Sequence, residues 1–326
     1  MHQIWELQQM QSLPLSAKVV MTQQRIREWY EHWDGMVYVS FSGGKDSTVL
    51  KHIVDSMYDD VPAVFVNTGL EYPEIQKFAM SQKNVVTVRP EMRFDEVIKK
   101  YGYPVVSKEV AQTVWEAKKN VKTGKYTYRI KKLNGELLDK NGKYSSYNIP
   151  KWKFLLDAPY DISHKCCDVM KKRPAKTYEK TTGRKAIIGT LASESTLRKT
   201  QWVKYGCNAF ETKRPTSQPL SFWTEQDILH YIKQFDVPYC SVYGNIVPDD
   251  EGTLLKTTGC VRTGCIFCMF GCHLEKEPNR FQRLKETHPR QYAYCIGGGE
   301  YVDGKWQPSK EGLGLGKVLD YINVKY

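Results

Sequence analysis

The sequence predicts an α/β protein with a doubly wound, mainly parallel sheet of Rossmann-like type. Apolar runs at residues 37–41, 61–67 and 84–89 have the length of short buried strands. Each of the first two runs is followed by polar residues and then by apolar residues at helical spacing. Alternating strands and helices join through right-handed crossovers, which makes the strands parallel and puts helices on both faces. Ligands of such sheets bind at the carboxyl ends of the strands.

Three regions are expected along the chain. Residues 1–35 form an N-terminal helical segment, because apolar residues recur there at helical spacing. Residues 36–240 form the nucleotide-binding α/β domain, and its last helix begins after Thr224, a good N-cap residue. Residues 241–326 form a C-terminal region with a cysteine-rich metal-binding loop and a basic helix.

The composition is that of a soluble protein with a large core. Of the 326 residues 41% are apolar and 12% aromatic, yet no stretch approaches the ~20 apolar residues of a membrane span. The N-terminus lacks the basic and apolar regions of a signal peptide, so we expect a cytoplasmic protein with no membrane partner. The net charge of +12 favours a polyanionic partner or reflects a generally basic surface.

The segment after the first strand has the chemistry of a phosphate-binding loop. It reads Ser42-Gly43-Gly44-Lys45-Asp46-Ser47 and leads directly into a helix. Two glycines allow close approach of the backbone to a phosphate, and the helix start offers free N–H groups and a positive dipole end. The spacing differs from both the Walker loop and G-x-G-x-x-G. We therefore expect an anion site of another type.

Two further segments follow strand ends and are expected at the same edge of the sheet. The second strand runs into Asn67, Thr68, Gly69 and Glu71. A buried strand at residues 186–189 runs into polar residues that suit phosphate or sulfate recognition, and these are Gly189, Ser193, Glu194 and Ser195, with Arg198 one turn later.

Residues 107–155 are basic and rich in tyrosine, and we expect a β-hairpin inserted into the α/β domain. Tyr126, Tyr128 and Ile130 alternate, and Asn134-Gly135 is a hairpin signal. Lysines interleaved with aromatic rings suit phosphate contacts and base stacking, although a solvated hairpin with packed tyrosines explains the same pattern. The insert and the basic helix after the cysteine loop are thus the candidate contacts to nucleic acid, either tRNA or DNA.

Clustered cysteines indicate a metal site. Nine cysteines in a cytoplasmic chain argue against a disulfide framework, and four of them crowd into one loop as Cys260-x4-Cys265-x2-Cys268-x3-Cys272. Thiolates are soft ligands for zinc and for iron–sulfur clusters, and four in one short loop favour a [4Fe–4S] cluster over zinc. We expect these four to be the ligands because near ligands close the smallest loops.

Several segments resemble known families. The hexapeptide SGGKDS resembles the SGGxDS signature of the PP-loop ATP pyrophosphatases, in the adenine-nucleotide alpha-hydrolase-like superfamily. NTGLEYPE is similar to the second nucleotide segment of sulfonucleotide reductases. With IIGTLASESTLR, QPLSFWTEQDILHYI, TGCIFC and KCCDVMKKRP, these segments resemble the phosphoadenylyl-sulfate (PAPS) reductase family over roughly residues 35 to 270. The resemblance implies a PP-loop fold, ATP or a related adenine nucleotide in the cradle, and sulfur chemistry.

The resemblance also offers a second ligand set. The adjacent pair Cys166-Cys167, followed far along the chain by Cys265 and Cys268, resembles the cluster pattern of assimilatory adenylyl-sulfate reductases. On that pattern these four would bind the metal. If the local four bind it instead, Cys167 is free to act as a sulfur carrier or nucleophile.

One departure from the family affects the predicted reaction. Sulfonucleotide reductases carry a nucleophilic cysteine in a C-terminal Cys-Gly-x-His element, whereas this chain has only Tyr294-Cys295-Ile296-Gly297. The basic insert and the cysteine loop fit better with the ATP pyrophosphatase branch, which includes the cluster-containing enzyme of DNA phosphorothioation and the tRNA thiolases.

We therefore expect an ATP pyrophosphatase-type enzyme that activates an acceptor for sulfur insertion, with Mg²⁺ as a cofactor. The expected catalytic residues are Lys45, Asp46, Arg198 and Cys167. A sulfur donor protein or a thioredoxin-like reductant is the expected protein partner. The alternatives are a sulfonucleotide reductase and a non-catalytic module that binds nucleotide and nucleic acid around a structural metal.

Overall fold

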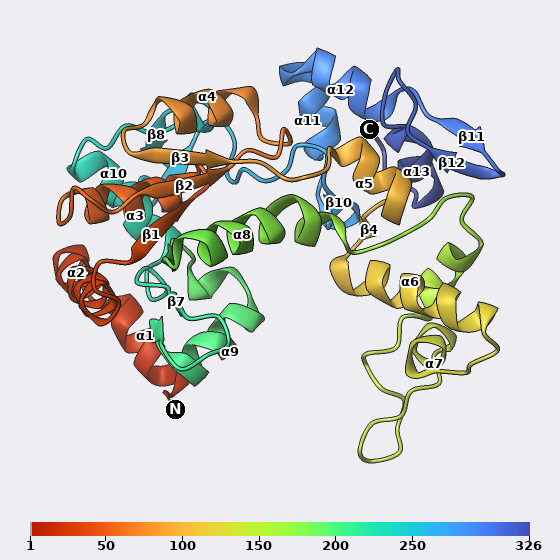
Figure 1. Ribbon diagram of the computed structural model, residues 1–326, viewed down its shortest axis with the longest axis horizontal. Helices are drawn as coiled ribbons and strands as arrows, with labels where there is room; N and C mark the ends of the chain where they lie inside the picture. Colours follow the sequence, from red (N-terminus) through yellow and green to blue (C-terminus); the bar gives the residue numbers. More distant parts are fainter. Residues whose placement is uncertain (1) are drawn as a thin grey trace. The chain divides into compact units, whose positions relative to one another are not determined.

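The computed structural model describes residues 2–326, which fold into two compact units (Figure 1). The first unit runs to residue 67 and adds residues 71–89 and 173–263. The second contains residues 68–70, 90–172 and 264–326. The chain therefore passes more than once between the units.

A six-stranded sheet forms the centre of the first unit, and it confirms the predicted mainly parallel α/β architecture. Its order is β3 (Val85–Val88), β2 (Ala63–Val66), β1 (Val37–Phe41), β5 (Lys185–Ile188), β7 (Thr216–Ser217) and β6 (Asn208–Ala209). All neighbouring pairs are parallel except the antiparallel pair of β6 and β7. After β1 the chain builds β2 and β3 on one side and places β5 on the other, so the strand order reverses at β1. Such a reversal is where open α/β sheets bind ligands.

Helices cover both faces of this sheet. Val37 and Val39 of β1 join the larger core, which also contains residues of α2 (Leu15–His32), α3 (Lys45–Asp55) and α10 (Glu225–Gln234). Tyr38 points to the opposite face, where it packs with Tyr178 of α8 (Arg173–Thr182). The remaining elements of the unit are α1 (Ile4–Ser12), α4 (Pro73–Ser81), α9 (Thr196–Tyr205) and the antiparallel pair β8 (Ile246–Pro248) and β9 (Leu255–Thr257).

The second unit is mainly helical. Its helices are α5 (Phe94–Tyr101), α6 (Lys108–Lys122), α7 (Tyr128–Asn134), α11 (Arg280–Thr287), α12 (Pro289–Ile296) and α13 (Leu315–Tyr321). Its strands are the parallel pair β4 (Val105–Val106) and β10 (Met269–Phe270) and the antiparallel pair β11 (Glu300–Val302) and β12 (Lys305–Gln307). Within residues 2–326 we find no helix with the length and apolar character needed to cross a membrane.

The predicted hairpin strand at Tyr126–Ile130 is wrong. Helix α7 begins at Tyr128, inside this stretch, and Gly135 ends the helix in the left-handed conformation with φ 79°. The Asn134-Gly135 pair is thus a helix C-cap, the other common use of a glycine with positive φ. A short hairpin does occur later, at Asn141-Gly142, where Leu138 and Tyr144 form an isolated antiparallel bridge.

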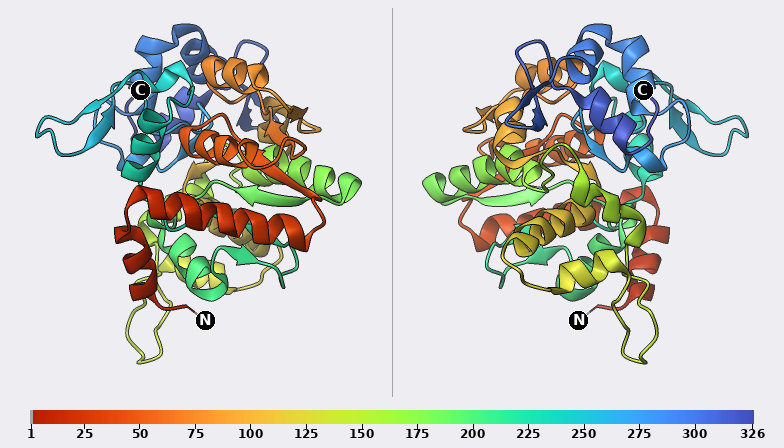
Figure 2. Two further views of the ribbon diagram at one scale, coloured as in Figure 1. Left: turned by 90° about the vertical axis from the view of Figure 1, so that its left-hand side faces the viewer. Right: turned by 90° about the vertical axis from the view of Figure 1, so that its right-hand side faces the viewer.

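A buried ion pair joins the N-terminal helices to α10. The Lys18 side chain of α2, the long red helix in the left view of Figure 2, is only 2% exposed. Its ammonium donates to Asp227 Oδ2 at 2.7 Å and to the Gln11 carbonyl at 2.7 Å. Asp227 also accepts from Thr224 in the predicted capping box, which the structure confirms. One carboxylate therefore fixes both the start of α10 and its contact with α2.

We expect Lys18→Ala to lower the free energy of unfolding by about 3 kcal/mol, because it leaves Asp227 as an uncompensated buried charge. Chemical denaturation monitored by circular dichroism measures this loss. Arg25→Ala is the control on the same helix, since Arg25 pairs with Glu28 at the surface and its loss is expected to cost less than about 1 kcal/mol. Equal losses in the two variants would contradict the structural role of Lys18.

Candidate functional site

The segment between β1 and α3 forms a compact cradle. The Ser42 and Ser47 hydroxyl oxygens are 3.0 Å apart, and the Ser42 N–H donates to Ser47 Oγ at 3.2 Å. Ser47 Oγ also lies 2.9 Å from the Gly44 carbonyl, to which it donates. Gly44 is the N-cap of α3, so the first N–H groups of the helix open at this turn. The two hydroxyls and the helix start give the polar surface that a phosphate requires.

Two glycines make this packing sterically feasible. Gly43 has φ +72°, and a Cβ there would lie 3.0 Å from Ile75 Cγ2 and 3.3 Å from Ala79 Cβ. A side chain at Gly189, at the end of β5, would also be too close to its neighbours, because its Cβ would lie 3.0 Å from the Asp46 carbonyl oxygen. The ends of β1 and β5 thus meet at the first turn of α3. The structure brings Gly189 to the Ser42–Ser47 cradle as the sequence predicts.

Asp46 is the unusual carboxylate of the cradle. Its Oδ1 is buried and has no hydrogen-bond partner among the described residues. Burial raises the pKa of Asp46, while the charges of Lys45 and Arg262 oppose this rise. A buried carboxylate oxygen without a hydrogen-bond donor lowers the stability of the fold unless a ligand binds to it. Carboxylate oxygens are the ligands that a hard cation such as Mg²⁺ prefers.

Lys45 is held by groups that the sequence did not indicate. Its side chain is buried, and the ammonium binds Glu225 Oε1 at 2.7 Å and the Val261 carbonyl at 2.6 Å. The hydroxyl of Tyr243 accepts from the Lys45 N–H at 3.3 Å and lies 2.7 Å from Thr263 Oγ1. Burial raises the pKa of Tyr243 to about 12. No local motif identifies these contacts, because they join residues about 200 positions apart.

The segment after β5 forms a second charged group. Glu194 makes ion pairs with both Arg198 and Arg262, and its Oε2 accepts from the Leu191 N–H at 3.3 Å. Ser195 is the N-cap of α9 and accepts from the Arg198 N–H at 3.3 Å. The predicted phosphate-binding residues Glu194 and Ser195 therefore also have local structural roles. Arg262 was missed because it lies inside the cysteine loop.

The residues after β2 are divided between the units. Asn67 belongs to the first unit, is only 5% exposed, and donates from its backbone to the Val88 carbonyl. Glu71 also belongs to the first unit, whereas Thr68 and Gly69 belong to the second. Thr68 Oγ1 accepts from the Leu70 N–H at 3.1 Å, which stabilises the turn locally. Their proposed role at the nucleotide site stays a prediction.

The second unit brings distant cysteines together. The pKa of Cys166 is raised by its hydrogen bond to Cys167 and by burial, and further by the charges of Cys265 and Cys268. The pKa of Cys268 is raised by burial and also by the charge of Cys167. The adjacent pair and the Cys-x-x-Cys segment are thus close enough to influence one another. Cys272 is buried and donates to the Met269 carbonyl at 3.1 Å, and Cys260 belongs to the first unit.

Cys167 has a lowered thiol pKa. The hydrogen bond from Cys166, assisted by the charges of Lys108, Lys171 and Lys172, lowers the pKa of Cys167 to about 6. Thiolates are both nucleophiles and metal ligands, so this environment fits either predicted role. Among residues 2–326, no three Cys, His, Asp or Glu side chains are already arranged to hold a metal ion.

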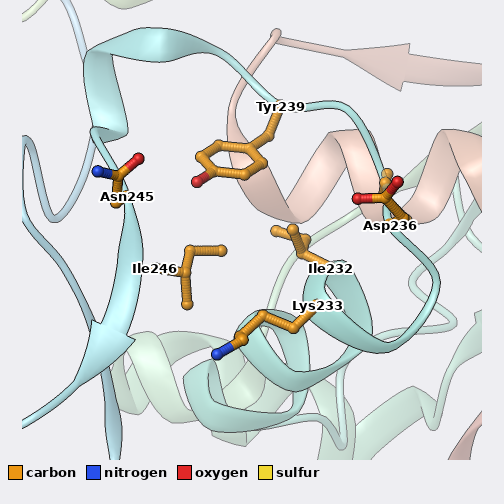
Figure 3. Close-up of a pocket in the computed structure, with 7 residues that line it drawn as sticks. Ile232, Lys233, Asp236, Tyr239, Asn245 and Ile246 are labelled. Atoms are coloured by element: carbon orange, nitrogen blue, oxygen red, sulfur yellow. The ribbon is translucent and has the colours of Figure 1, made fainter.

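A separate cavity of about 290 Å³ lies between the end of α10 and β8 (Figure 3). Lys233, Tyr239 and Ile246 line it. None of the residues predicted from the sequence to bind nucleotide belongs to its lining. The cavity is therefore not the predicted nucleotide site.

Comparison with known proteins identifies the family. The family model described as "Phosphoadenosine phosphosulfate reductase domain" matches residues 36–270, which include the whole cradle, both strand-end segments and the cysteines up to Cys268. The chain belongs to the PAPS reductase family, within the PP-loop superfamily.

The individual relatives are distant. The chain is 24% identical over 277 residues to the uncharacterized protein MJ0973 of Methanocaldococcus jannaschii, covering 82% of this chain and 49% of that protein. It is 23% identical over 293 residues to MJ0066 of the same organism, covering 86% of this chain and 48% of that protein. The chain thus spans about half the length of the curated relatives it matches.

Two solved structures share a remote likeness. The PAPS reductase of Candida auris, crystallised as a phosphate complex, matches 68% of this chain and 82% of its own, with 15% identity and a TM-score of 0.38. The FMN adenylyltransferase of Candida glabrata matches 74% of this chain and 65% of its own, with 12% identity and a TM-score of 0.36. Scores this low carry no argument about function.

We expect Gly43→Ala to destabilise the protein more than the backbone strain alone explains. Gly252→Ala is the matched control, because Gly252 has nearly the same φ, +71°, but a Cβ there would meet open space. The left-handed conformation costs about 1–2 kcal/mol in each variant, and Gly43→Ala adds the contacts with Ile75 and Ala79. Urea unfolding measures the difference, and calorimetric titration with ATP is expected to show weaker binding only in Gly43→Ala. Equal losses of stability with unchanged ATP affinity would contradict the cradle.

Proposed function

We propose that the protein is an ATP pyrophosphatase-type enzyme that binds an adenine nucleotide at Ser42–Ser47 and acts in sulfur transfer. The observation that carries this proposal is the buried, unpartnered Asp46 oxygen beside a glycine cradle, at the point where the strand order reverses. Close backbone approach at glycines, N–H donors at a helix start and a carboxylate for a bound cation are the features that suit a site for nucleotide phosphates.

The proposed reaction takes place at the alpha phosphate. A nucleophilic oxygen of the acceptor forms a bond to the alpha phosphorus, and the bond from that phosphorus to the bridging oxygen breaks. Pyrophosphate leaves with the electron pair, and the acceptor is left adenylylated. A sulfide-level sulfur nucleophile then forms a bond to the acceptor carbon, the bond from that carbon to the oxygen of AMP breaks, and AMP leaves with the electron pair.

The charged residues around the cradle suit this reaction. Lys45, Arg198 and Arg262 each pair with a carboxylate of the same unit. A bound polyphosphate offers these cations a stronger charge-assisted partner than Glu225 or Glu194 does. We propose that Lys45, Arg198 and Arg262 exchange their carboxylate partners for the phosphates of the bound nucleotide. They then stabilise the negative charge that develops on the leaving pyrophosphate.

Mg²⁺ fits this site. Asp46 would hold the ion through its free oxygen, and Ser42 and Ser47 supply neutral oxygens in the same segment. The ion would supply charge neutralisation for the phosphate oxygens. Asp46 also lies on the first turn of α3, so the helix positions its carboxylate at the cradle.

A thiolate-bound metal fits the second unit. We propose that Cys166, Cys167, Cys265 and Cys268 hold a [4Fe–4S] cluster, because their charges already act on one another. The set of Cys260, Cys265, Cys268 and Cys272 is the competing ligand set, and zinc is the competing metal. A cluster would either cross-link the segments that carry its cysteine ligands or transfer electrons in the reaction.

A sulfonucleotide reductase is the second candidate. The juxtaposition of Cys166-Cys167 with Cys265 and Cys268 favours it, because this resembles the cluster pattern of adenylyl-sulfate reductases. Cys295 argues against it. Its side chain is fully buried, so it is a poor replacement for the exposed C-terminal nucleophile of those enzymes.

We expect the protein to convert α-labelled ATP to AMP and pyrophosphate in the presence of Mg²⁺, with water as a slow acceptor. Asp46→Asn keeps the size of the side chain but removes its charge, and is expected to lower this rate by about 100-fold or more. The rate is measured by chromatographic separation of labelled AMP.

Asp55→Asn is the control for this experiment, because Asp55 lies at the other end of α3 and pairs with Lys51. Its rate is expected to match that of the unmodified protein. Release of sulfite from adenylyl sulfate with thioredoxin, and no pyrophosphate from ATP, would replace the proposal with the reductase. Nucleotide binding without either product would favour a non-catalytic module.

We expect the anaerobically purified protein to contain iron and sulfide and to absorb broadly near about 400 nm. Cys166→Ser is expected to lose the iron and Cys260→Ser to retain it, whereas Cys265→Ser loses it with either ligand set. Iron retained in Cys166→Ser but lost in Cys260→Ser would establish the local ligand set instead. A colourless protein with stoichiometric zinc would exclude the cluster.

A further inference from the structure

Residues 107–155 of the second unit carry a large share of the positive charge of the chain. They contain twelve Lys and Arg against four Asp and Glu, which gives +8 of the total net charge of +12. They form α6, α7, a long exposed loop at residues 136–149, and a short helix at Pro150–Asp157. In both Figure 1 and Figure 2 the loop extends away from α6 and α7 as a narrow hairpin. We call these 49 residues the basic insert.

The carboxylates of the basic insert make ion pairs and hydrogen bonds with other residues of the insert. Glu109 pairs with Lys132, and Glu116 Oε2 pairs with Arg129 Nε at 2.7 Å. Asp139 Oδ1 accepts from the N–H groups of Asn141 and Lys143 inside the loop. Glu136 accepts from the Tyr126 hydroxyl. The acidic groups therefore support the fold of the insert.

The exposed lysines have no such partners. Within the described part of the chain, eight exposed lysines of the insert make no ion pair, and these are Lys108, Lys119, Lys125, Lys131, Lys140, Lys143, Lys151 and Lys153. Eight exposed cations without carboxylates repel one another and attract a polyanion. The positive charge of this surface is thus available to a ligand.

Aromatic rings lie between these lysines. Tyr144 is 80% exposed and Tyr147 is 69% exposed, and both belong to the loop. The loop is an ordered structure, because the Asn148 side chain donates to the carbonyls of Gly135 and Leu137 and accepts from the Leu137 N–H. Leu133 and Leu155, both fully buried, anchor its two ends. Rings held open to solvent on an ordered loop offer flat faces for stacking.

We propose that the basic insert binds a single-stranded nucleic acid, with Tyr144 and Tyr147 stacked on bases and Lys140 and Lys143 at phosphates. Stacking on exposed rings combined with lysine contacts to the backbone is how proteins bind single strands without reading sequence. A duplex keeps its bases stacked on one another and leaves the tyrosines without partners. The only arginine of the insert, Arg129, is paired with Glu116, so the insert offers no free guanidinium to the edge of a guanine in a groove.

This inference goes beyond the proposed function and stands without it, because binding of a strand requires no turnover of ATP. The test is fluorescence anisotropy of the full chain, without nucleotide, with labelled single strands of about 15 bases in DNA and RNA form and with the matching duplex. We expect the single strands to bind more tightly than the duplex. Tyr144→Ala/Tyr147→Ala is expected to weaken single-strand binding at least about tenfold, since each stacked base contributes about 1–3 kcal/mol.

The role of the lysines is tested separately, through the salt dependence of binding. Lys140→Gln/Lys143→Gln is expected to reduce the slope of log affinity against log salt by about 1.4, or about 0.7 for each lost phosphate contact. The control for charge is Lys99→Gln/Lys100→Gln on α5, and the control for an exposed ring is Tyr301→Ala on β11, where Tyr301 is 53% exposed. Both controls are expected to bind as the unmodified protein does.

Tyr144→Phe/Tyr147→Phe retains the rings and is expected to retain the affinity, which separates stacking from any loss of folding. Duplex binding as tight as single-strand binding would overturn the proposal. So would tyrosine variants with unchanged affinity, or binding to vesicles of phosphatidylcholine and phosphatidylserine that is insensitive to competing single strands.

Discussion

The close approach of three backbone segments around the first turn of α3 is the constraint on which the proposed nucleotide site depends. Gly43 turns the chain out of β1, Gly189 brings the end of β5 against the Asp46 carbonyl, and α4 packs over Gly43 through Ile75 and Ala79. Side chains at either glycine would push the segments apart. Because the segments meet without side chains between them, the serine hydroxyls and the start of α3 lie together at the edge of the sheet.

This geometry also explains the electrostatics of the site. The first unit holds Lys45, Arg198 and Arg262 close to Glu225 and Glu194, so each of these five side chains has a partner of opposite charge. Pairing offsets the cost of burying Lys45, which is only 5% exposed. In the proposed function, phosphate binding is therefore an exchange of partners. For the proposed site, this exchange favours a polyphosphate with its cation over a single small anion, because the polyphosphate offers more charges to the cations.

The sheet and the cradle could be predicted from the sequence because their signals are local. The apolar runs at β1, β2 and β3 and the Ser42–Ser47 segment each occupy a few consecutive residues. Tyr243, Thr263 and Glu225 could not be predicted, since they reach Lys45 only through the tertiary fold and follow no motif. The helix α7 was mistaken for a strand because a glycine with positive φ serves hairpins and helix ends equally.

The cysteines show why closeness in sequence does not by itself determine which thiols bind a metal. Loop closure favours ligands close in sequence, but its cost grows only by about 0.6 kcal/mol for each doubling of the loop. That cost applies only if the metal itself must close the loop.

The second unit already brings Cys166 and Cys167 near Cys265 and Cys268. The parallel pair of β4 and β10 joins the two halves of the sequence of this unit, with Val105 paired to Met269. Once folding has closed a loop of this length, ligand choice depends on local geometry and on the charge of nearby groups. Lys108 and Arg280 act on these thiols and stabilise their ionised form, which is the form that binds a metal.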